Sequence, residues 1–81
     1  MQRFFFDIRH GSEFIEDPEG SLCVDLQDAI SEASAAAREL LAAEISAGAA
    51  PDGRILEVRD EQRRVVALIP FRSILQNPGP S

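Results

Sequence analysis

The side chains that could carry out chemistry are few, because the chain has one histidine and one cysteine. His10 and Cys23 could act as base and nucleophile, with Asp7, Asp17 or Asp25 orienting the imidazole. Their spacing matches no nucleophilic motif. His10 lies in a turn signal, and Cys23 lies in a short alternating apolar stretch where cysteine is usually a small buried hydrophobe. The sequence therefore predicts no catalytic residues, and a small hydrolase is the least favoured function.

Oxygen ligands for a metal such as calcium could come from Asp17, Glu19 and Asp25. Their spacing lacks the ligand run of an EF-hand loop, and simpler roles exist. Asp25 is suited to cap a helix, while Asp17 and Gly20 fit a reverse turn in which glycine takes a positive φ. A single cysteine excludes an internal disulfide and a multi-cysteine metal site. We predict no metal-binding and no cofactor-binding residues.

The stretch from Asp25 to Gly48 is the segment most clearly patterned as one helix. Asp25 is a good N-cap, and Gly48 can adopt the left-handed conformation that ends a helix. Apolar residues recur between them at three- and four-residue spacing and form one stripe. The stripe consists of Leu26, Ala29, Ile30, Ala33, Ala37, Leu40 and Leu41. Further alanines on the outer surface indicate high helix propensity or a close contact with another chain.

The rest of the chain reads as short strands separated by breakers. Arg3–Arg9 alternates, with Phe4, Phe6 and Ile8 on one face. The other expected strands are Glu13–Glu16, resumed at Ser21–Val24, then Ile55–Asp60 and Arg64–Ile69, with a helical turn at Phe71–Leu75. The predicted fold class is α+β, in the order β-β-α-β-β. About four mainly antiparallel strands carry one long helix on one face. Residues 1–75 form the expected domain, and residues 76–81 form a flexible tail.

The composition of the chain limits the classes of partner that it can bind. The 81-residue chain is 44% hydrophobic and 27% charged, with a formal net charge of −6. This acidic balance argues against direct nucleic-acid binding, since such proteins usually carry a basic stripe. The late arginines, Arg59, Arg63, Arg64 and Arg72, alternate with acids and indicate a solvated face. No apolar run is long enough for a membrane span or a signal peptide, so we expect a cytoplasmic protein.

A mismatch between the single long helix and strands that are apolar on both faces predicts a homodimer. A single helix covers one face of a sheet, yet the strand at residues 65–69 is apolar on both faces, and Phe5 lies opposite Phe4. Strands that are apolar on both sides usually have both sides covered. The cover could be the C-terminal turn or a second copy of the chain. The residues expected at an interface are Phe5, Val65, Ala67, Ile69 and Phe71. Pro70-Phe71 could also form part of a peptide-binding edge.

Several short motifs occur in a familiar order along nearly the whole chain. They are the aromatic opening Arg3-Phe4-Phe5-Phe6-Asp7-Ile8-Arg9, then Asp17-Pro18-Glu19-Gly20, Val24-Asp25-Leu26 with Ala29, Glu32 and Ala33, and Ile69-Pro70-Phe71. The chain thereby resembles the bacterial domain-of-unknown-function family numbered 6894. This resemblance implies a bacterial stand-alone domain with no established activity and no catalytic residues to transfer. Cys23 departs from the pattern, at a position where nothing reactive is expected.

Two functions remain open from the sequence. The first is a non-enzymatic protein-interaction module that self-associates and binds through its sheet or helix surface. The second is an antitoxin-like regulator that neutralises a basic partner, which the acidic charge permits. The second hypothesis rests on an analogy of fold.

Overall fold

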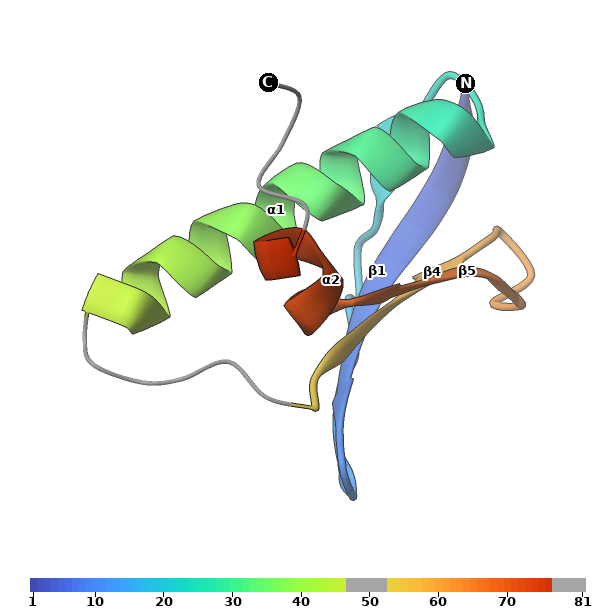
Figure 1. The fold of residues 1–81 in the computed structure, drawn as a ribbon. Coiled ribbons are helices and arrows are strands. Elements are labelled where there is room, and N and C mark those ends of the chain that lie inside the picture. Colours follow the sequence, from blue (N-terminus) through green and yellow to red (C-terminus); the bar gives the residue numbers. More distant parts are fainter. Residues whose placement is uncertain (47–52, 77–81) are drawn as a thin grey trace.

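Residues 1–46 and 53–76, which the computed structural model describes, form five strands and two helices. Figure 1 shows α1 lying across one face of the sheet, with α2 between α1 and the end of β5. The elements are β1 (Gln2–His10), β2 (Glu13–Ile15), β3 (Ser21–Cys23), α1 (Leu26–Ser46), β4 (Ile55–Arg59), β5 (Val65–Pro70) and α2 (Phe71–Gln76). The predicted α+β class, with an antiparallel sheet and one long helix on one face, is confirmed.

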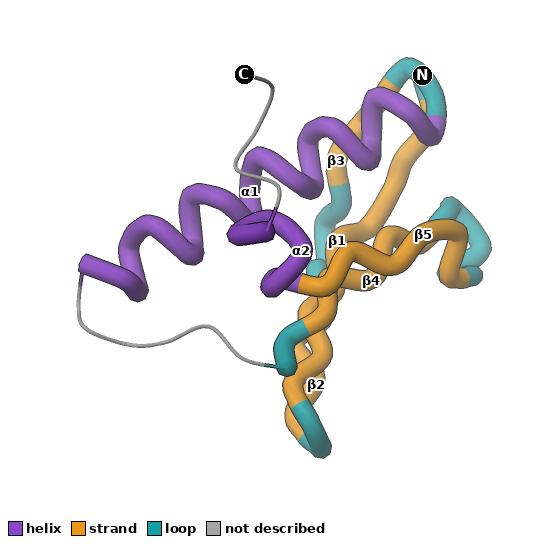
Figure 2. Tube along the Cα trace, in the orientation of Figure 1, coloured by secondary structure: helices purple, strands orange, loops and turns teal. Residues whose placement is uncertain are grey.

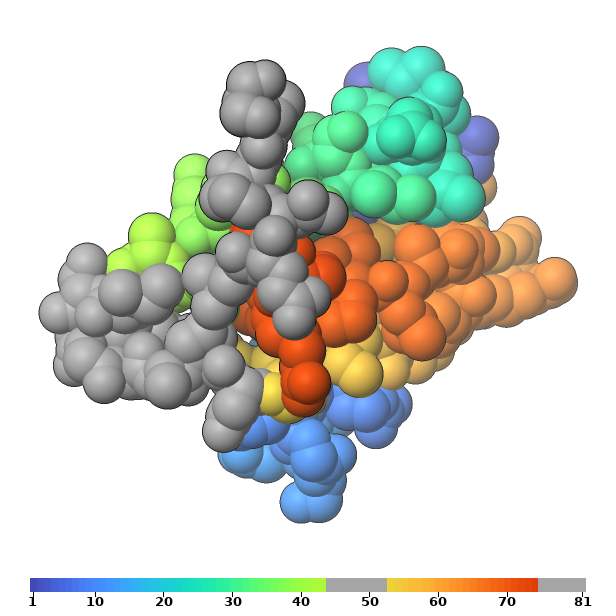
Figure 3. Space-filling model, viewed as in Figure 1, coloured from blue at the N-terminus to red at the C-terminus, as the bar shows by residue number. Residues whose placement is uncertain are grey.

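The sheet is ordered β2-β1-β4-β5, and β3 also pairs with β1. All of these pairs are antiparallel. In the β1–β2 pair, Ile8 is the partner of Ile15. If this register continued without interruption, Phe4 would be the partner of Glu19. Phe4 is instead the partner of Ser21, in the β1–β3 pair. Two extra residues therefore bulge out between β2 and β3, which divides the resumed strand into two elements (Figure 2). The β1–β2 and β4–β5 hairpins project from the body on two sides (Figure 3).

The connector between β2 and β3 is held by Asp17. Its Oδ1 accepts a hydrogen bond from the Gly20 N–H at 3.2 Å, and its Oδ2 accepts one from the Phe6 N–H at 3.2 Å. Gly20 has a φ of 71°. A Cβ at this position would lie 2.6 Å from the Phe4 carbonyl oxygen, so the site requires glycine for two separate reasons. The predicted turn at Asp17–Gly20 is confirmed.

Helix α1 begins as the sequence predicts. Asp25 Oδ1 accepts from the Asp28 N–H at 2.8 Å, and Asp28 Oδ2 accepts from the Val24 N–H at 3.0 Å. These reciprocal bonds satisfy backbone donors at the helix start. The predicted end at Gly48 lies outside the described residues.

The apolar stripe of α1 is narrower than predicted. Ala29, Ala33, Ala37 and Leu41 are buried, whereas Leu26 and Leu40 are 38% and 42% exposed. Small side chains at the contact bring the helix close to the sheet, where longer ones would hold it away.

The core lies between α1 and the sheet. Phe4, Leu56, Val58 and Ile69 fill it from the strands, with Phe6 and Ile8 partly buried against them. Helix α2 closes one end of the same core, because Phe71 and Ile74 are buried there. The Phe71 N–H donates to the Arg54 carbonyl, and the Ser73 hydroxyl donates to the Pro70 carbonyl. Pro70 ends β5 as predicted, while residues 77–81 of the expected tail lie outside the described residues.

Candidate functional site

Four charged side chains meet on the sheet surface opposite α1, which we call the far face. Asp7 and Arg9 come from β1, and Glu57 and Arg59 come from its neighbour β4. Arg59 Nη2 lies 2.6 Å from Glu57 Oε1, and Arg59 Nε lies 3.1 Å from Asp7 Oδ2. Arg9 Nε donates to Glu57 Oε2 at 2.7 Å. We call these four residues the far-face cluster.

Both carboxylates of the cluster are buried, with Asp7 1% and Glu57 7% exposed. Burial of a charge is costly unless partners compensate for the lost water, and here two guanidinium groups do so. The hydrogen bond from Arg9 lowers the pKa of the Glu57 carboxyl below its usual value, and Arg59 acts in the same direction, whereas burial opposes both. The two carboxylates and the two guanidinium groups of the cluster thus balance one another's charge within the chain.

Aromatic rings and arginines of the same chain cover the far face. The guanidinium carbons of Arg9 and Arg59 lie 4.6 Å and 5.7 Å from the centre of the Phe14 ring. Arg63 lies 3.7 Å from the centre of the Phe5 ring. The inference that strands apolar on both sides need cover from beyond the helix, by the C-terminal turn or a second copy, is therefore wrong at the centre of the far face. That centre is charged and covered by the chain itself.

The cluster also anchors two loops. Asp7 Oδ1 accepts from the Asp17 N–H at 2.8 Å, which ties the β2–β3 connector to the sheet. Arg59 Nη1 donates to the Arg63 carbonyl at 2.8 Å, in the β4–β5 turn. The interpretation of the late arginines as a solvated face is thus wrong for Arg59. One signal in the sequence could have indicated this: Glu57 and Arg59 lie two apart in a strand, and therefore on one face.

The candidate nucleophile and base are kept apart. Cys23 pairs with Gln2 at one end of β1, and Glu13 pairs with His10 at the other end. Eight residues of extended strand separate the two ends by about 26 Å. Cys23 is fully buried and lies with its Sγ 3.1 Å from Glu32 Oε2. Burial, together with the hydrogen bond to Glu32, raises the pKa of the thiol to about 11, so the nucleophilic thiolate is disfavoured.

Comparison with known protein families matches residues 3–72 to the domain of unknown function DUF6894. The chain belongs to this family. The match runs from β1 into α2, so the sheet, α1 and the far-face cluster all lie within the DUF6894 domain. The resemblance seen in the sequence motifs is thereby confirmed. No curated protein and no solved structure matches the chain.

Asp17 and Asp25, two of the three acidic residues considered as metal ligands, have structural roles in this DUF6894 domain. Both carboxylate oxygens of Asp17 accept backbone N–H groups, and Asp25 caps α1. Across residues 1–46 and 53–76, no group of three or more histidine, cysteine, aspartate or glutamate side chains is arranged to hold a metal ion. In the same residues, neither helix is both long and apolar enough to cross a membrane.

Most of the expected interface residues are buried or partly buried within the DUF6894 domain. Phe5, Ile69 and Phe71 are buried, and Ala67 packs against the core, whereas Val65 is 43% exposed. Two other residues of β5 are exposed as well, Val66 at 37% and Leu68 at 59%. Sequence alternation alone did not single them out. We call Val65, Val66 and Leu68 the β5 strip.

Proposed function

We propose that this DUF6894 domain is a small non-enzymatic protein-interaction module that pairs with a second copy of itself through the β5 strip. A bacterial, cytoplasmic setting, which the sequence implies, is part of this proposal. The single observation that carries it is the exposure of three large aliphatic side chains on β5, a strand at one edge of the sheet.

The position of the strip favours contact with another chain. β5 is at the end of the strand order and has one neighbour, β4, among the described strands. Leu68 lies opposite Glu57, and Val65 lies opposite Arg59, so both are next to the far-face cluster. Adjacent exposed aliphatic residues in a small domain are typical of a contact surface.

The charge pattern favours a second copy as the partner. No charged residue occurs in the sequence between Arg64 and Arg72. Two chains, each with a formal charge of −6, can therefore bring their β5 strips together without placing an acidic residue of β5 itself in the contact. The contact would be isologous, with the same strip used on both sides.

The polar groups support binding over catalysis. The Cys23 thiol is buried and protonated, and the carboxylates of Asp7, Asp17 and Glu57 all accept bonds from within the domain. These groups stabilise the fold, whereas the exposed side chains of the β5 strip do not pack in the interior of the domain.

Analytical ultracentrifugation tests the proposal over a wide concentration range, from low micromolar to near millimolar. The wild-type chain is expected to shift from monomer to dimer, and Leu68→Lys is expected to remain monomeric because a charge in the strip opposes its burial. Leu22→Lys is the matched control, since Leu22 is 52% exposed on β3, away from the strip. It is expected to dimerise like the wild type.

A wild-type chain that stays monomeric throughout would overturn the proposal, as would equal loss of association in both variants. The alternative of an antitoxin-like regulator makes a different prediction. Its complex with a basic partner would weaken steeply as salt rises, because exposed charges are screened. Pairing through the uncharged β5 strip is expected to persist at high salt.

A further inference from the structure

The short strand β2 lies at the sheet edge opposite β5. Among the described strands it has one neighbour, β1, and its residues Glu13, Phe14 and Ile15 are all exposed. Phe14 lies on the far face and Ile15 on the helix side, because successive side chains of a strand alternate. A strand at an edge presents backbone groups without partners, and these can pair with another chain.

The hairpin register shows which backbone groups of β2 point outward. A two-residue loop joins β1 and β2, with a φ of 62° at Gly11, as a tight hairpin turn requires. His10 and Glu13 flank this loop and exchange backbone hydrogen bonds across it, so the next pair, Arg9 and Phe14, exchanges none. The N–H and C=O of Phe14 therefore point away from β1, toward the open edge.

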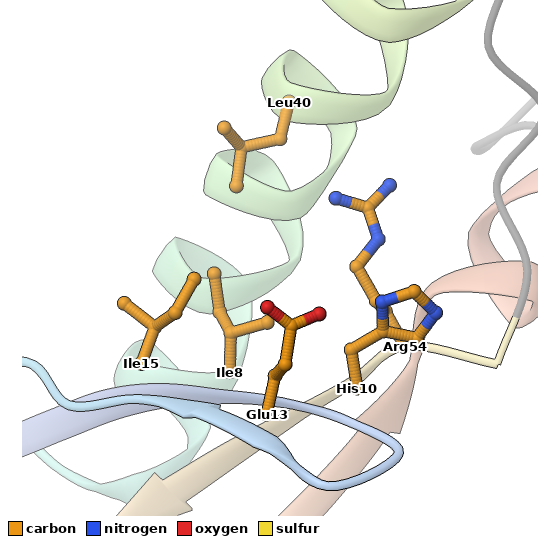
Figure 4. A pocket seen from close by; sticks show the side chains of 6 residues that line it. All are labelled: Ile8, His10, Glu13, Ile15, Leu40 and Arg54. Atoms are coloured by element: carbon orange, nitrogen blue, oxygen red, sulfur yellow. The ribbon is translucent and has the colours of Figure 1, made fainter.

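A cavity of about 250 Å³ lies beside this edge, between the tip of the β1–β2 hairpin and α1. Its lining consists of Ile8, His10, Glu13, Ile15, Leu40 and Arg54. Figure 4 shows the three aliphatic side chains toward one end of the cavity and the polar ones toward the other. His10 and Arg54 already have interaction partners within the chain, so only the aliphatic end is available to another molecule.

The aliphatic end of the cavity adjoins the open edge. Ile15 belongs to β2 and is 63% exposed, and Leu40 on α1 is 42% exposed. Leu40 is flanked at helical spacing by Ala36 and Ala43, which are both exposed. These small side chains leave room beside Leu40 for an apolar side chain of a partner.

Acidic side chains flank the apolar pair on β2. Glu13 precedes Phe14 and Glu16 follows Ile15, and both glutamates are exposed. Glu13 forms no salt bridge with another described residue, whereas Glu16 lies 3.5 Å from Arg63. The edge therefore offers two apolar side chains between two acidic ones, in a chain with a formal charge of −6. Basic side chains at matching spacing complement this pattern.

We propose that β2 binds an extended segment of a partner protein in which two apolar residues lie between two basic ones. The segment adds to β2 as an antiparallel strand, and its backbone pairs with the N–H and C=O of Phe14. Its residue opposite Ile15 lies on the helix side, against Ile15 and Leu40, because side chains alternate along the added strand. Its residue opposite Phe14 contacts the exposed part of that ring. The two basic residues lie opposite Glu13 and Glu16. This surface is separate from the β5 strip.

The test is a titration of the ¹⁵N-labelled full chain followed by NMR, with the peptide acetyl-Thr-Lys-Leu-Val-Lys-Thr-amide at low salt. In the proposed register, the leucine of the peptide lies opposite Ile15 and its valine lies opposite Phe14. We expect saturable shifts at the backbone amides of Phe14, Ile15 and Leu40.

Two altered peptides separate the backbone contribution from the charge contribution. A peptide with N-methylated valine cannot donate to the Phe14 carbonyl, and is expected to bind about three- to tenfold more weakly, as for loss of one hydrogen bond. A peptide with both lysines replaced by glutamate is expected to give no saturable shift, because like charges oppose docking.

Matched variants of the chain test the side chains. Ile15→Thr keeps a β-branched side chain but makes it polar, and is expected to weaken binding about three- to tenfold. Val24→Thr makes a similar change at a residue that is 66% exposed and outside the cavity, and is expected to bind like the wild type. Glu13→Gln is expected to weaken binding about two- to fivefold, whereas Glu61→Gln, in the β4–β5 turn, is expected to leave it unchanged. The spectra themselves report whether each variant is folded.

The proposal is overturned if the first peptide causes no saturable shift, or if the shifts lie away from β2 and Leu40. Equal binding of the N-methylated peptide would also overturn it, because the contact would then not be a strand addition. Equal effects of Ile15→Thr and Val24→Thr would rule out the aliphatic contact. Leu68→Lys, which opposes pairing through the β5 strip, is expected to bind the peptide like the wild type, so failure of one proposal is distinguishable from failure of the other.

Discussion

Arg59 connects three parts of the fold. Its guanidinium contacts Glu57 within its own strand and Asp7 on the neighbouring strand, and it also donates to the Arg63 carbonyl in the following turn. Only arginine presents enough donors in one plane for these three directions. The cluster therefore fixes how β1, β4 and the β4–β5 turn lie relative to one another.

Replacing Asp7 with asparagine tests this role. Asp7→Asn retains an oxygen for the Asp17 N–H but removes the charge beside Arg59. We expect the free energy of unfolding to fall by about 3 kcal/mol, as for removal of one partner of a buried pair. Urea denaturation measures the change. Glu16→Gln, which removes an exposed acid 3.5 Å from Arg63, is the control and is expected to cost less than about 1 kcal/mol.

The lowered pKa of Glu57 makes stability depend on pH. A carboxyl with a depressed pKa in the fold contributes its full stabilisation above its unfolded value of about 4.3 and loses it as the pH falls through the folded value. We expect unfolding free energies to be level near neutral pH and to decline below about pH 4.3. Glu57→Gln should flatten part of that decline. A decline identical to the wild type would contradict this assignment.

The Cys23 thiol, with its pKa raised to about 11, should react slowly in the native chain. We expect labelling by a disulfide reagent at neutral pH to follow global unfolding, and to accelerate along the urea transition. The unfolded thiol has a pKa of about 8.5, so the fold favours the protonated form. Stability contributed by this group is present below that value and is lost as the pH rises toward 11. Fast labelling of the folded protein would revive the catalytic hypothesis.

At the scale of elements, turns decide where strands end. The β2–β3 connector contains two more residues than an uninterrupted antiparallel pairing with β1 would need. Hydrogen bonds among Asp7, Asp17 and Gly20 hold the connector in place. The connector gives β3 a register on β1 in which Cys23 faces the core beneath α1. A change in the connector should therefore affect packing as well as the turn.

Two glycine substitutions separate backbone strain from steric overlap. Gly11 and Gly20 have similar positive φ values, 62° and 71°. An added Cβ meets nothing within 4 Å at Gly11, but meets the Phe4 carbonyl oxygen and the Phe5 ring at Gly20. We expect Gly11→Ala to cost about 1 kcal/mol from its φ alone, and Gly20→Ala to cost clearly more. Thermal unfolding compares the two, and equal costs would show that the β2–β3 connector relaxes freely.

Local signals in the sequence were sufficient to predict where helices, strands and turns lie. They were insufficient to predict which strands are neighbours in the sheet. The Asp25 cap, the Asp17–Gly20 turn, the faces of β1 and the stop at Pro70 each depend on residues within a few positions, and all were predicted. The contact of Asp7 with Arg59 joins residues far apart in the chain. Alternation shows that each lies on a given face, but not which strand is its neighbour. The strand order and the far-face cluster therefore could not be predicted.

At the scale of the whole molecule, the described residues pack around one core, which both helices share. α1 contributes mainly alanine at its contact, while α2 contributes Phe71 and Ile74 from the C-terminal end of the described chain. The cavity beside the β1–β2 hairpin has no local sequence signal either, because its walls come from three separate segments. Most of the large side chains in the core come from β1, β4 and α2, so the domain depends on contacts between its two ends.

Truncation of Phe71 tests that dependence. Phe71 is fully buried, so Phe71→Ala should cost about 3 to 5 kcal/mol. A chain of 81 residues has a total stability of only about 4 to 12 kcal/mol. We expect the variant to be largely unfolded at physiological temperature, with a loss of far-ultraviolet circular dichroism. Phe14→Ala, at a ring that is 41% exposed, is the control and should retain its fold.

The end of β5 has a consequence for how far any assembly can grow. Pro70 has no N–H to offer, its carbonyl is occupied by the Ser73 hydroxyl, and the strand is irregular near its start where it passes Val58 and Arg59. An added strand would therefore find few backbone donors and acceptors on this edge of β5 with which to form hydrogen bonds. Chains that meet through aliphatic side chains alone should stop at a closed pair. Fibrous, amyloid-like stacking should be rare even in concentrated solution.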